Sequence, residues 1–208
     1  MRGWIPVLLL GAALGAVQVH VQTATQHIRQ TLPPDENPQY FPIGLFSEFA
    51  DASEWVARWY ASELRKLAEP SLWTATPKQG AALFRFTVIP CRAPSFIVRL
   101  AVDSDGSGTL TTKWRVRSNG ATEASDVRQE SMPVGSEQVK KFVELLNDAD
   151  FWSLPAEKPA QGLDGQEWLL EGKQNGEYHI VDRWNGVMED SYHKACEYLY
   201  KLGFAKAN

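Results

Sequence analysis

Cysteine is scarce in this sequence, which holds two cysteines in 208 residues. Two thiols are too few for a disulfide-rich scaffold or for a zinc site built from four thiolates. Positive charge is not in excess either: the net charge of -4 and the pI near 5.6 argue against a general nucleic-acid-binding protein. The phosphate-binding loops and the nucleophile elbow of common enzyme folds are missing, so the sequence predicts no cofactor.

Long apolar runs are also rare, and the clearest one follows Arg2 at residues 5–17, IPVLLLGAALGAV. This run has the length of a signal-peptide core and is short for a membrane span, which needs about 20 residues. We expect residues 1–24 to be a cleaved signal peptide, with Ala24 near the cut, so that the protein is periplasmic or secreted. Two alternatives stay open: an uncleaved anchor to the inner membrane formed by residues 5–21, or a cytosolic protein.

The rest of the chain has the composition of one folded domain. Its 44% hydrophobic and 11% aromatic content is enough for a core, and its eight tryptophans favour extensive aromatic packing. Residues 25–45 contain TLPPDENPQYFPIG, a proline-rich stretch typical of a linker. The sequence therefore predicts a single domain over 46–208.

Hydrophobic periodicity predicts an α+β fold, in which about three helices pack on an antiparallel meander sheet. Helical spacing covers 52–68, 137–148 and 189–202, and alternation with a period of two covers 83–89, 96–102 and 109–117. The alternation predicts one buried face for the three strands. The opposite face is either solvated or an anion-binding surface, and it carries five basic residues: Arg85, Arg99, Lys113, Arg115 and Arg117.

A second hairpin is predicted around the Asn175-Gly176 dipeptide, which favours a two-residue turn. With this turn, Trp168 faces Arg183, and we expect a cation–π contact between them. His179 shares that face, whereas Asp182 points to the opposite one and is expected to accept a hydrogen bond from a donor such as a tyrosine hydroxyl. His179 and Asp182 are therefore not expected to form a catalytic pair.

Two functions from different classes remain. The first is a non-enzymatic, exported binding or interaction domain for a protein or small ligand in the cell envelope, with no role in nucleic-acid binding. Its candidate binding residues are Trp168, His179, Arg183 and Asp164. The alternative is a hydrolase that uses His179 with Glu167 or Asp164.

Two further patterns have a structural and a chemical interpretation. DSDGSGTL at 103–110 resembles the start of a calcium loop, with weak candidate ligands Asp103, Asp105 and Ser107. Trp114 stands where such a loop requires a glutamate, so we expect a plain turn and predict no metal. Cys91 and Cys196 either pair in an oxidising compartment or stay buried free thiols.

The C-terminal half contains the motifs FWSLP at 151–155, GLDGQEWLLEG at 162–172 and GEYHIVDRW at 176–184, followed by a closing helix. Over about residues 82–203 this order resembles an uncharacterised group of small exported bacterial proteins. The resemblance implies the order strands, helix, aromatic hook, hairpin, helix, and it implies export. It implies no reaction and assigns no functional residue.

Overall fold

The computed structural model describes residues 40–46, 50–117, 124–157, 165–184 and 190–204. By its internal contacts the chain divides into two units, residues 1–35 and 36–208, and all described residues belong to the second. The predicted signal peptide or anchor and most of the predicted linker lie outside the described residues.

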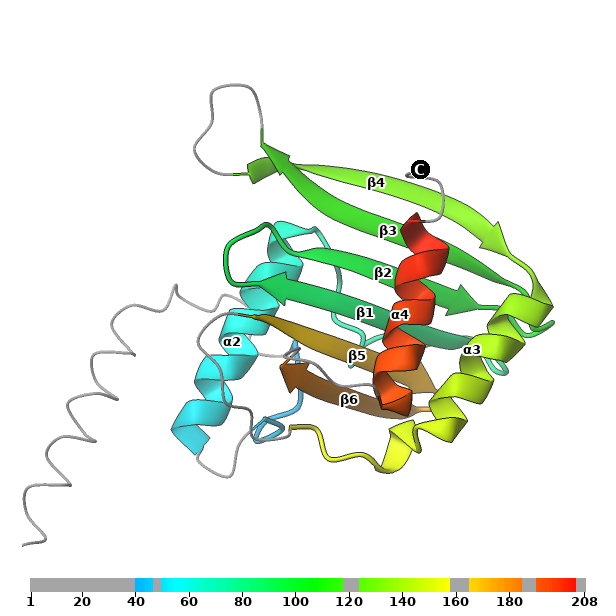
Figure 1. Cartoon of the computed structure of the whole chain (residues 1–208). Coiled ribbons are helices and arrows are strands. Elements are labelled where there is room, and N and C mark those ends of the chain that lie inside the picture. Colours follow the sequence, from blue (N-terminus) through cyan, green and yellow to red (C-terminus); the bar gives the residue numbers. More distant parts are fainter. Residues whose placement is uncertain (1–39, 47–49, 118–123, 158–164, 185–189, 205–208) are drawn as a thin grey trace, which may run out of the picture. The chain divides into compact units, whose positions relative to one another are not determined.

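A six-stranded antiparallel sheet forms the centre of the described unit (Figure 1). The strands lie in the order β4-β3-β2-β1-β5-β6, so the first four make a meander and the last two join its other side as a hairpin. Their bounds are β1 Ala82–Pro90, β2 Phe96–Val102, β3 Gly108–Arg117, β4 Ala124–Val134, β5 Gln166–Gln174 and β6 Glu177–Trp184.

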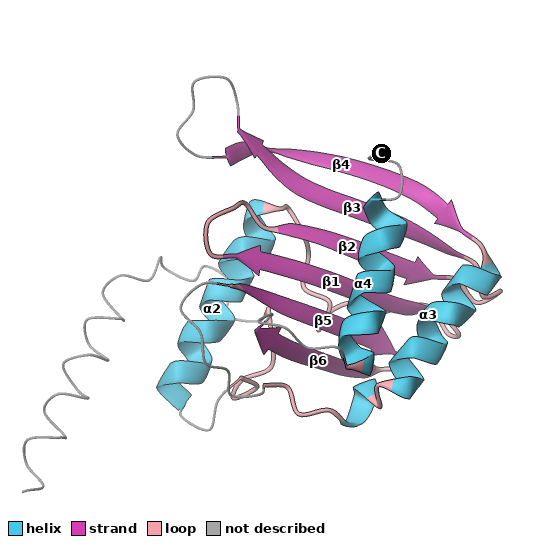
Figure 2. Cartoon of the chain, in the orientation of Figure 1, coloured by secondary structure: helices cyan, strands magenta, loops and turns pink. Residues whose placement is uncertain are grey.

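Three α-helices occur in the described part of the chain and pack against this sheet: α2 Ala50–Lys66, α3 Ser136–Asp148 and α4 Ser191–Phe204. Figure 2 shows α3 and α4 in front of the sheet and α2 behind it. A short 3-10 turn, η1 Phe151–Ser153, follows α3. The predicted α+β class, the three helices and the meander are therefore confirmed, with helix ends shifted by up to two residues.

Strand β4 is the element that the periodicity analysis missed. Among its described side chains, those of residues 126–134, most are polar and exposed, and only Val134 at the end is fully buried. An edge strand of this kind has no apolar alternation to reveal it. Its register with β3 is regular from Gly108 opposite Val134 to Val116 opposite Asp126, with a shift after that pair.

The face of the sheet under α3 and α4 carries the larger apolar core. Phe84, Phe86 and Leu100 are each no more than 2% exposed, and they meet Phe142 of α3 and Leu199 of α4. Helix α4 continues through Gly203 to Phe204. A Cβ on Gly203 would lie 2.8 Å from Thr112 Oγ1 and 3.0 Å from Val98, so glycine is present because α4 approaches the sheet closely.

The opposite face is buried as well, which corrects the expectation of one buried face. Tyr60 and Leu64 of α2 pack with Ile97, Leu169 and Ile180 of the sheet in a second, separate core. Because each face has its own core, strands β5 and β6 carry apolar residues on both faces.

The basic row was expected to be either solvated or an anion-binding surface, and a solvated face is wrong for two of its members, Arg85 and Lys113. Arg85 is 0% exposed and Lys113 is 7% exposed. Arg85 Nε and Nη2 lie 2.7 and 2.6 Å from Glu171 Oε2, and Tyr178 donates a hydrogen bond to the other oxygen of Glu171 at 2.9 Å. The anion that this basic face binds is thus the carboxylate of Glu171, a residue of the same chain.

A second carboxylate enters the same network from the segment after α2. Glu69, 2% exposed, lies 3.1 Å from Arg99 Nε, 2.8 Å from Lys113 Nζ and 3.5 Å from Arg85 Nη1. Arg85 Nη1 also donates to the carbonyl of Pro70 at 2.6 Å, and Lys113 donates to a carbonyl at the end of α2. These charged contacts attach the end of α2 to three strands at once.

Local backbone structure prepares α2 for this attachment. Ala68 has φ 51°, the left-handed conformation that ends many helices. The N–H of Glu69 donates to the carbonyl of Leu64 at 3.0 Å, and that of Ala68 donates to Arg65 at 2.8 Å, which together form a Schellman ending. The chain thereby turns inward and directs Glu69 to the basic residues of the sheet.

Replacing Arg85 by methionine should lower the free energy of unfolding by about 3–5 kcal/mol, because Glu171 would lose its buried cationic partner. Urea unfolding followed by tryptophan fluorescence measures the loss. The double variant Arg85→Met/Glu171→Gln should be more stable than Arg85→Met alone, since it leaves no uncompensated Glu171 charge. Lys201→Met, on the exposed Lys201–Glu197 pair, is the control and should change stability by less than about 0.5 kcal/mol. A near-neutral Arg85→Met would contradict this account of the network.

Candidate functional site

The hairpin of β5 and β6 has the predicted register. Gln174 lies opposite Glu177 across the Asn175-Gly176 turn, and both turn residues have positive φ, 51° and 83°. Trp168 therefore lies opposite Arg183, and Leu169 lies opposite Asp182, as expected. The two faces of this hairpin hold different groups of polar residues.

On the face toward α4, Trp168 packs into the core. Its ring meets Phe86 edge-on at 5.1 Å between centroids and lies 5.3 Å from the ring of His193. The predicted cation–π contact with Arg183 is not formed. The Arg183 guanidinium lies instead over Tyr192, 5.7 Å from the ring centre. Although Trp168 and Arg183 are cross-strand neighbours, α4 inserts Tyr192 and His193 on this face, and these rings take the contacts.

Arg183 fastens the segment that follows η1. It is 5% exposed and donates hydrogen bonds to the carbonyls of Pro155 at 3.0 Å and Ala156 at 3.4 Å. The backbone N–H of Asp182 donates to the same Ala156 carbonyl at 2.6 Å. Residues 155 and 156 thus cover part of the outer edge of β6, and Arg183 has a structural role at this place.

His179 also lies under the aromatic hook, which is the segment 151–155. Its ring is 5.1 Å from Phe151 and 6.1 Å from Trp152, and burial lowers the pKa of the imidazole. The hook approaches closely because Gly172, opposite His179, has no side chain; a Cβ there would lie 2.9 Å from Phe151. The three candidate binding residues Trp168, His179 and Arg183 therefore share a face but contact the protein interior.

The alternative pair of His179 with Glu167 is not assembled. Glu167 lies on the face toward α2, with Asp182, whereas His179 lies on the face toward the hook. Residues on opposite faces of one sheet cannot exchange a proton directly. Asp164, the other proposed partner, lies outside the described residues.

A cluster of carboxyl groups occupies the α2 face of the hairpin. Tyr60 of α2 donates a hydrogen bond to Asp182 Oδ2 at 2.5 Å, which confirms the expected tyrosine donor for Asp182. Asp182 is 8% exposed, and its side chain also hydrogen-bonds that of Glu167. Glu157 lies at the end of the segment that covers β6, where the charge of Asp182 helps to raise the pKa of the Glu157 carboxyl group.

Burial raises the pKa values of all three acids. It raises the pKa of Glu167 to about 8, with a further contribution from the Asp182 charge, and it raises the pKa of Glu157 to about 7. Burial raises the pKa of Asp182 to about 6, although the hydrogen bonds from Tyr60 and Glu167 oppose the rise. Near neutral pH, Glu167 is therefore a protonated acid beside an ionised Asp182, an arrangement suited to proton transfer.

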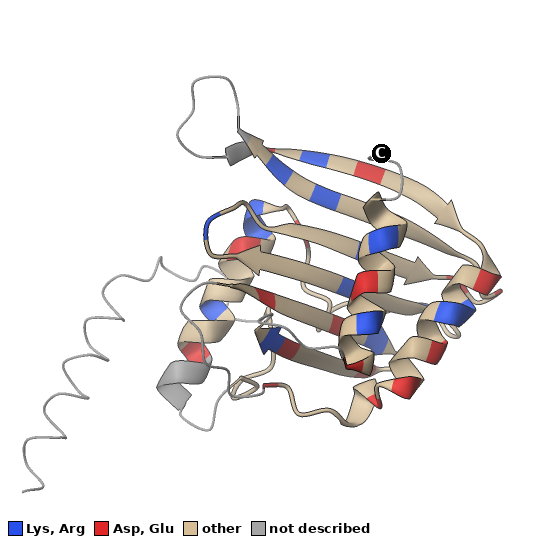
Figure 3. Ribbon diagram, in the orientation of Figure 1, with Lys and Arg blue, Asp and Glu red and all other residues tan. Residues whose placement is uncertain are grey.

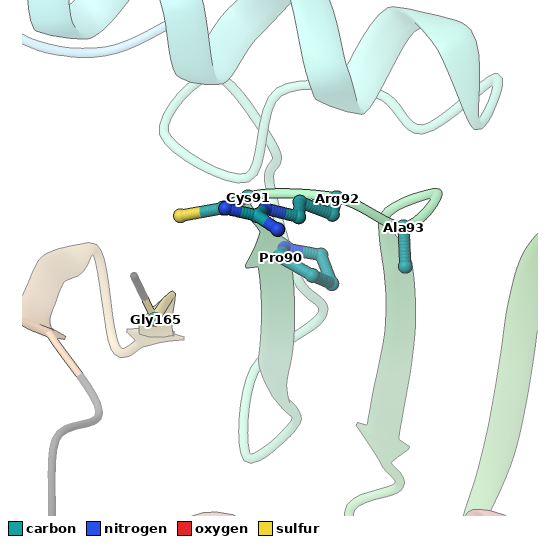
Figure 4. Close-up of a pocket in the computed structure, with 5 residues that line it drawn as sticks. All are labelled: Pro90, Cys91, Arg92, Ala93 and Gly165. Atoms are coloured by element: carbon teal, nitrogen blue, oxygen red, sulfur yellow. The ribbon is translucent and has the colours of Figure 1, made fainter. Parts of the chain in front are cut away.

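An open pocket lies at the ends of β1 and β5 (Figure 4). It has a volume of about 450 Å³ and is lined by Pro90, Cys91, Arg92, Ala93 and Gly165. Cys91 is exposed there, while Cys196 is buried in the core under α4, and both are free thiols in the structure. Burial raises the pKa of Cys196, so this thiol is unreactive at neutral pH.

The 103–108 segment is a tight turn between β2 and β3, as expected. Asp105 Oδ1 accepts hydrogen bonds from the N–H and the hydroxyl of Ser107, at 2.9 and 2.7 Å. The Asp103 N–H donates to the Ser107 carbonyl at 2.8 Å. Two of the three weak candidate metal ligands, Asp105 and Ser107, are thus hydrogen-bonded to each other within the turn. Among the residues that the structure describes, no group of three or more His, Cys, Asp or Glu is placed to hold a metal ion.

Comparison with known proteins identifies no relative. No protein-family model matches the chain, and a search of curated proteins finds none that is similar. In the described ranges, no helix has both the length and the apolar character that a membrane crossing needs.

Two groups of potentially functional residues escaped the sequence analysis. The first is Tyr60 and Glu157, which join Asp182 and Glu167 only through tertiary contacts, so no local pattern signals them. The second is strand β4. Its alternating charges at Asp126, Arg128 and Glu130 are a period-two signal in polar rather than apolar residues, and counting charge as well as hydrophobicity would have found it.

The pKa of Glu167 predicts how stability depends on pH. Between about pH 5 and pH 8 the folded chain keeps a proton that an unfolded glutamate has lost, so stability should fall as the pH rises through this window. Glu167→Gln removes that penalty. Its melting temperature should match the wild type at pH 5 and exceed it at pH 8. A constant difference between the two chains from pH 5 to pH 8 would contradict the raised pKa.

Proposed function

We propose that this chain is an exported, non-enzymatic interaction domain. In this proposal a strand of the partner pairs with the outer edge of β4. One observation supports the proposal: β4 is an 11-residue edge strand that pairs only with β3 among the described residues. The apolar run after Arg2 supports export. An exposed strand edge offers unpaired N–H and C=O groups to another chain.

The direction of the β4 amides follows from the hydrogen-bond alternation of antiparallel strands, in which successive residues bond to opposite neighbours. Asp182 donates its N–H away from β5, to Ala156. This alternation can be followed from β6 to β4 through the registers of all six strands. It directs the backbone groups of the odd-numbered residues of β4 outward, away from β3. Pro133, which has no N–H, occupies one of these outward positions, where a proline leaves the ladder with β3 intact.

The two edges of the sheet differ in how they are protected. Residues 155 and 156 cover β6 at Asp182, and Arg183 holds them there. On β4, the side chains from Asp126 to Ser131 are exposed, and Val127 is 37% exposed. Figure 3 shows bands of both charge signs along β4. The edge thus has a recognisable pattern as well as free backbone groups.

Hydrogen exchange tests strand addition. In dilute buffer the amides of Val127, Gln129 and Ser131 should exchange fast, and an extract of the cells that make the protein should slow them. The variant Gln129→Pro removes one outward N–H without touching the β3 ladder, so it should fold normally and lose the protection. Peptides from α3 serve as the internal control. Equally fast exchange with and without extract would argue against this function.

The carboxyl cluster supports a second candidate, an acid–base hydrolase that uses Glu167 as the proton donor and Asp182 as the base. The opposed protonation states of this pair at neutral pH favour it. The test is hydrolysis of p-nitrophenyl esters and glycosides, in which Glu167→Gln should lower the rate by about 100-fold or more. Its fold can be checked by the melting temperature at pH 5. Absence of hydrolysis by the wild-type chain would remove this candidate.

A further inference from the structure

We propose that the strand added to β4 is β4 of a second copy of this chain, paired antiparallel about a two-fold axis through Gln129. This inference rests on the proposed function and names its partner. In such a pair, residues whose numbers sum to twice the central number lie opposite each other. Gln129 is the middle residue of β4, which spans Ala124–Val134, so this register uses the whole strand.

The backbone geometry suits this register. Gln129 is one of the outward-directed residues, so the two copies of it form a hydrogen-bonded pair on the axis. Val127 lies opposite Ser131 of the second copy, also as a hydrogen-bonded pair. One reciprocal set of N–H and C=O groups is thereby satisfied on the axis and one more on each side of it. Pro133 falls near the end of the pairing, where its missing N–H removes a single bond.

The charges on β4 complement each other in the same register. Arg128 lies opposite Glu130 of the second copy, and Glu130 lies opposite Arg128, so two cross-strand ion pairs flank the axis. Both residues are exposed, and in the monomer they face the uncharged Trp114 and Thr112 of β3. These positions are non-hydrogen-bonded pairs, in which side chains of opposite strands approach most closely.

This pattern differs from the charged edges that keep sheets apart. An edge protected against association places like charges or lysines where a second copy would pair. A register with its axis two residues away, at Val127, would also bring opposite charges together at Asp126 and Arg128. That register pairs only residues 124–130 and leaves the remainder of β4 uncovered. The register about Gln129 is therefore the one that the strand favours.

The test is the oligomeric state of the full chain, measured by analytical ultracentrifugation up to about 100 µM. The wild type should be a dimer in reversible equilibrium with monomer. Arg128→Glu alone places like charges opposite each other at two sites and should raise the dimer dissociation constant by about tenfold. Glu130→Arg alone should do the same. The double variant Arg128→Glu/Glu130→Arg restores both ion pairs and should return the constant to within about threefold of the wild type.

Two controls keep the result interpretable. Lys140→Glu reverses an exposed charge on α3 and should leave the dimer unchanged. Melting temperatures of all variants show whether the fold is intact. A wild-type chain that is monomeric over the whole range overturns the inference, as does a dimer that the single charge reversals do not weaken or that the double variant does not restore. A monomeric chain whose β4 amides are still protected by cell extract would leave the proposed function standing with a different partner.

Discussion

The buried contact between Arg85 and Glu171 is the interaction on which the position of helix α2 against the sheet depends. A guanidinium with 0% exposure is tolerated only when its charge and its donors are matched, and Glu171, Glu69 and the Pro70 carbonyl match them. Because Glu69 and Pro70 follow α2 directly, the same contacts fix where that helix ends on the sheet. The position of α2 then brings Tyr60 over Asp182 and so determines the environment of the carboxyl cluster.

Sequence patterns predicted the elements whose apolar residues repeat with a clear period. The three helices, the first three strands and the register of the second hairpin followed from spacing and from the Asn175-Gly176 turn. The patterns failed where a partner is remote in sequence. Arg85 looked solvated because Glu69 and Glu171 reach it only in the folded chain, and Arg183 was assigned to Trp168 because the insertion of Tyr192 from α4 has no local signal.

The polar residues of the hairpin and those of β4 serve different purposes in this account. Trp168, His179 and Arg183 hold α4, the aromatic hook and the covered edge of β6 together, so their chemistry is directed inward. Glu167 and Asp182 form a proton-sharing pair whose protonation changes near neutral pH. On β4, by contrast, the backbone groups of odd-numbered residues and a self-complementary set of charges are directed to solvent. Trp168, His179 and Arg183 therefore stabilise the fold, and the edge of β4 is the surface that we propose for recognition.

Crosslinking through a cysteine placed on the proposed two-fold axis tests most directly whether two copies of β4 pair. The exposed Cys91 is first replaced by serine, and Gln129→Cys is introduced in that background. A short bis-maleimide should then convert the chain to a covalent dimer in high yield, because the two cysteines face each other across the added strand. Val143→Cys on α3, 37% exposed, is the matched control and should stay monomeric. Equal crosslinking at both positions, or none at residue 129, would contradict the account.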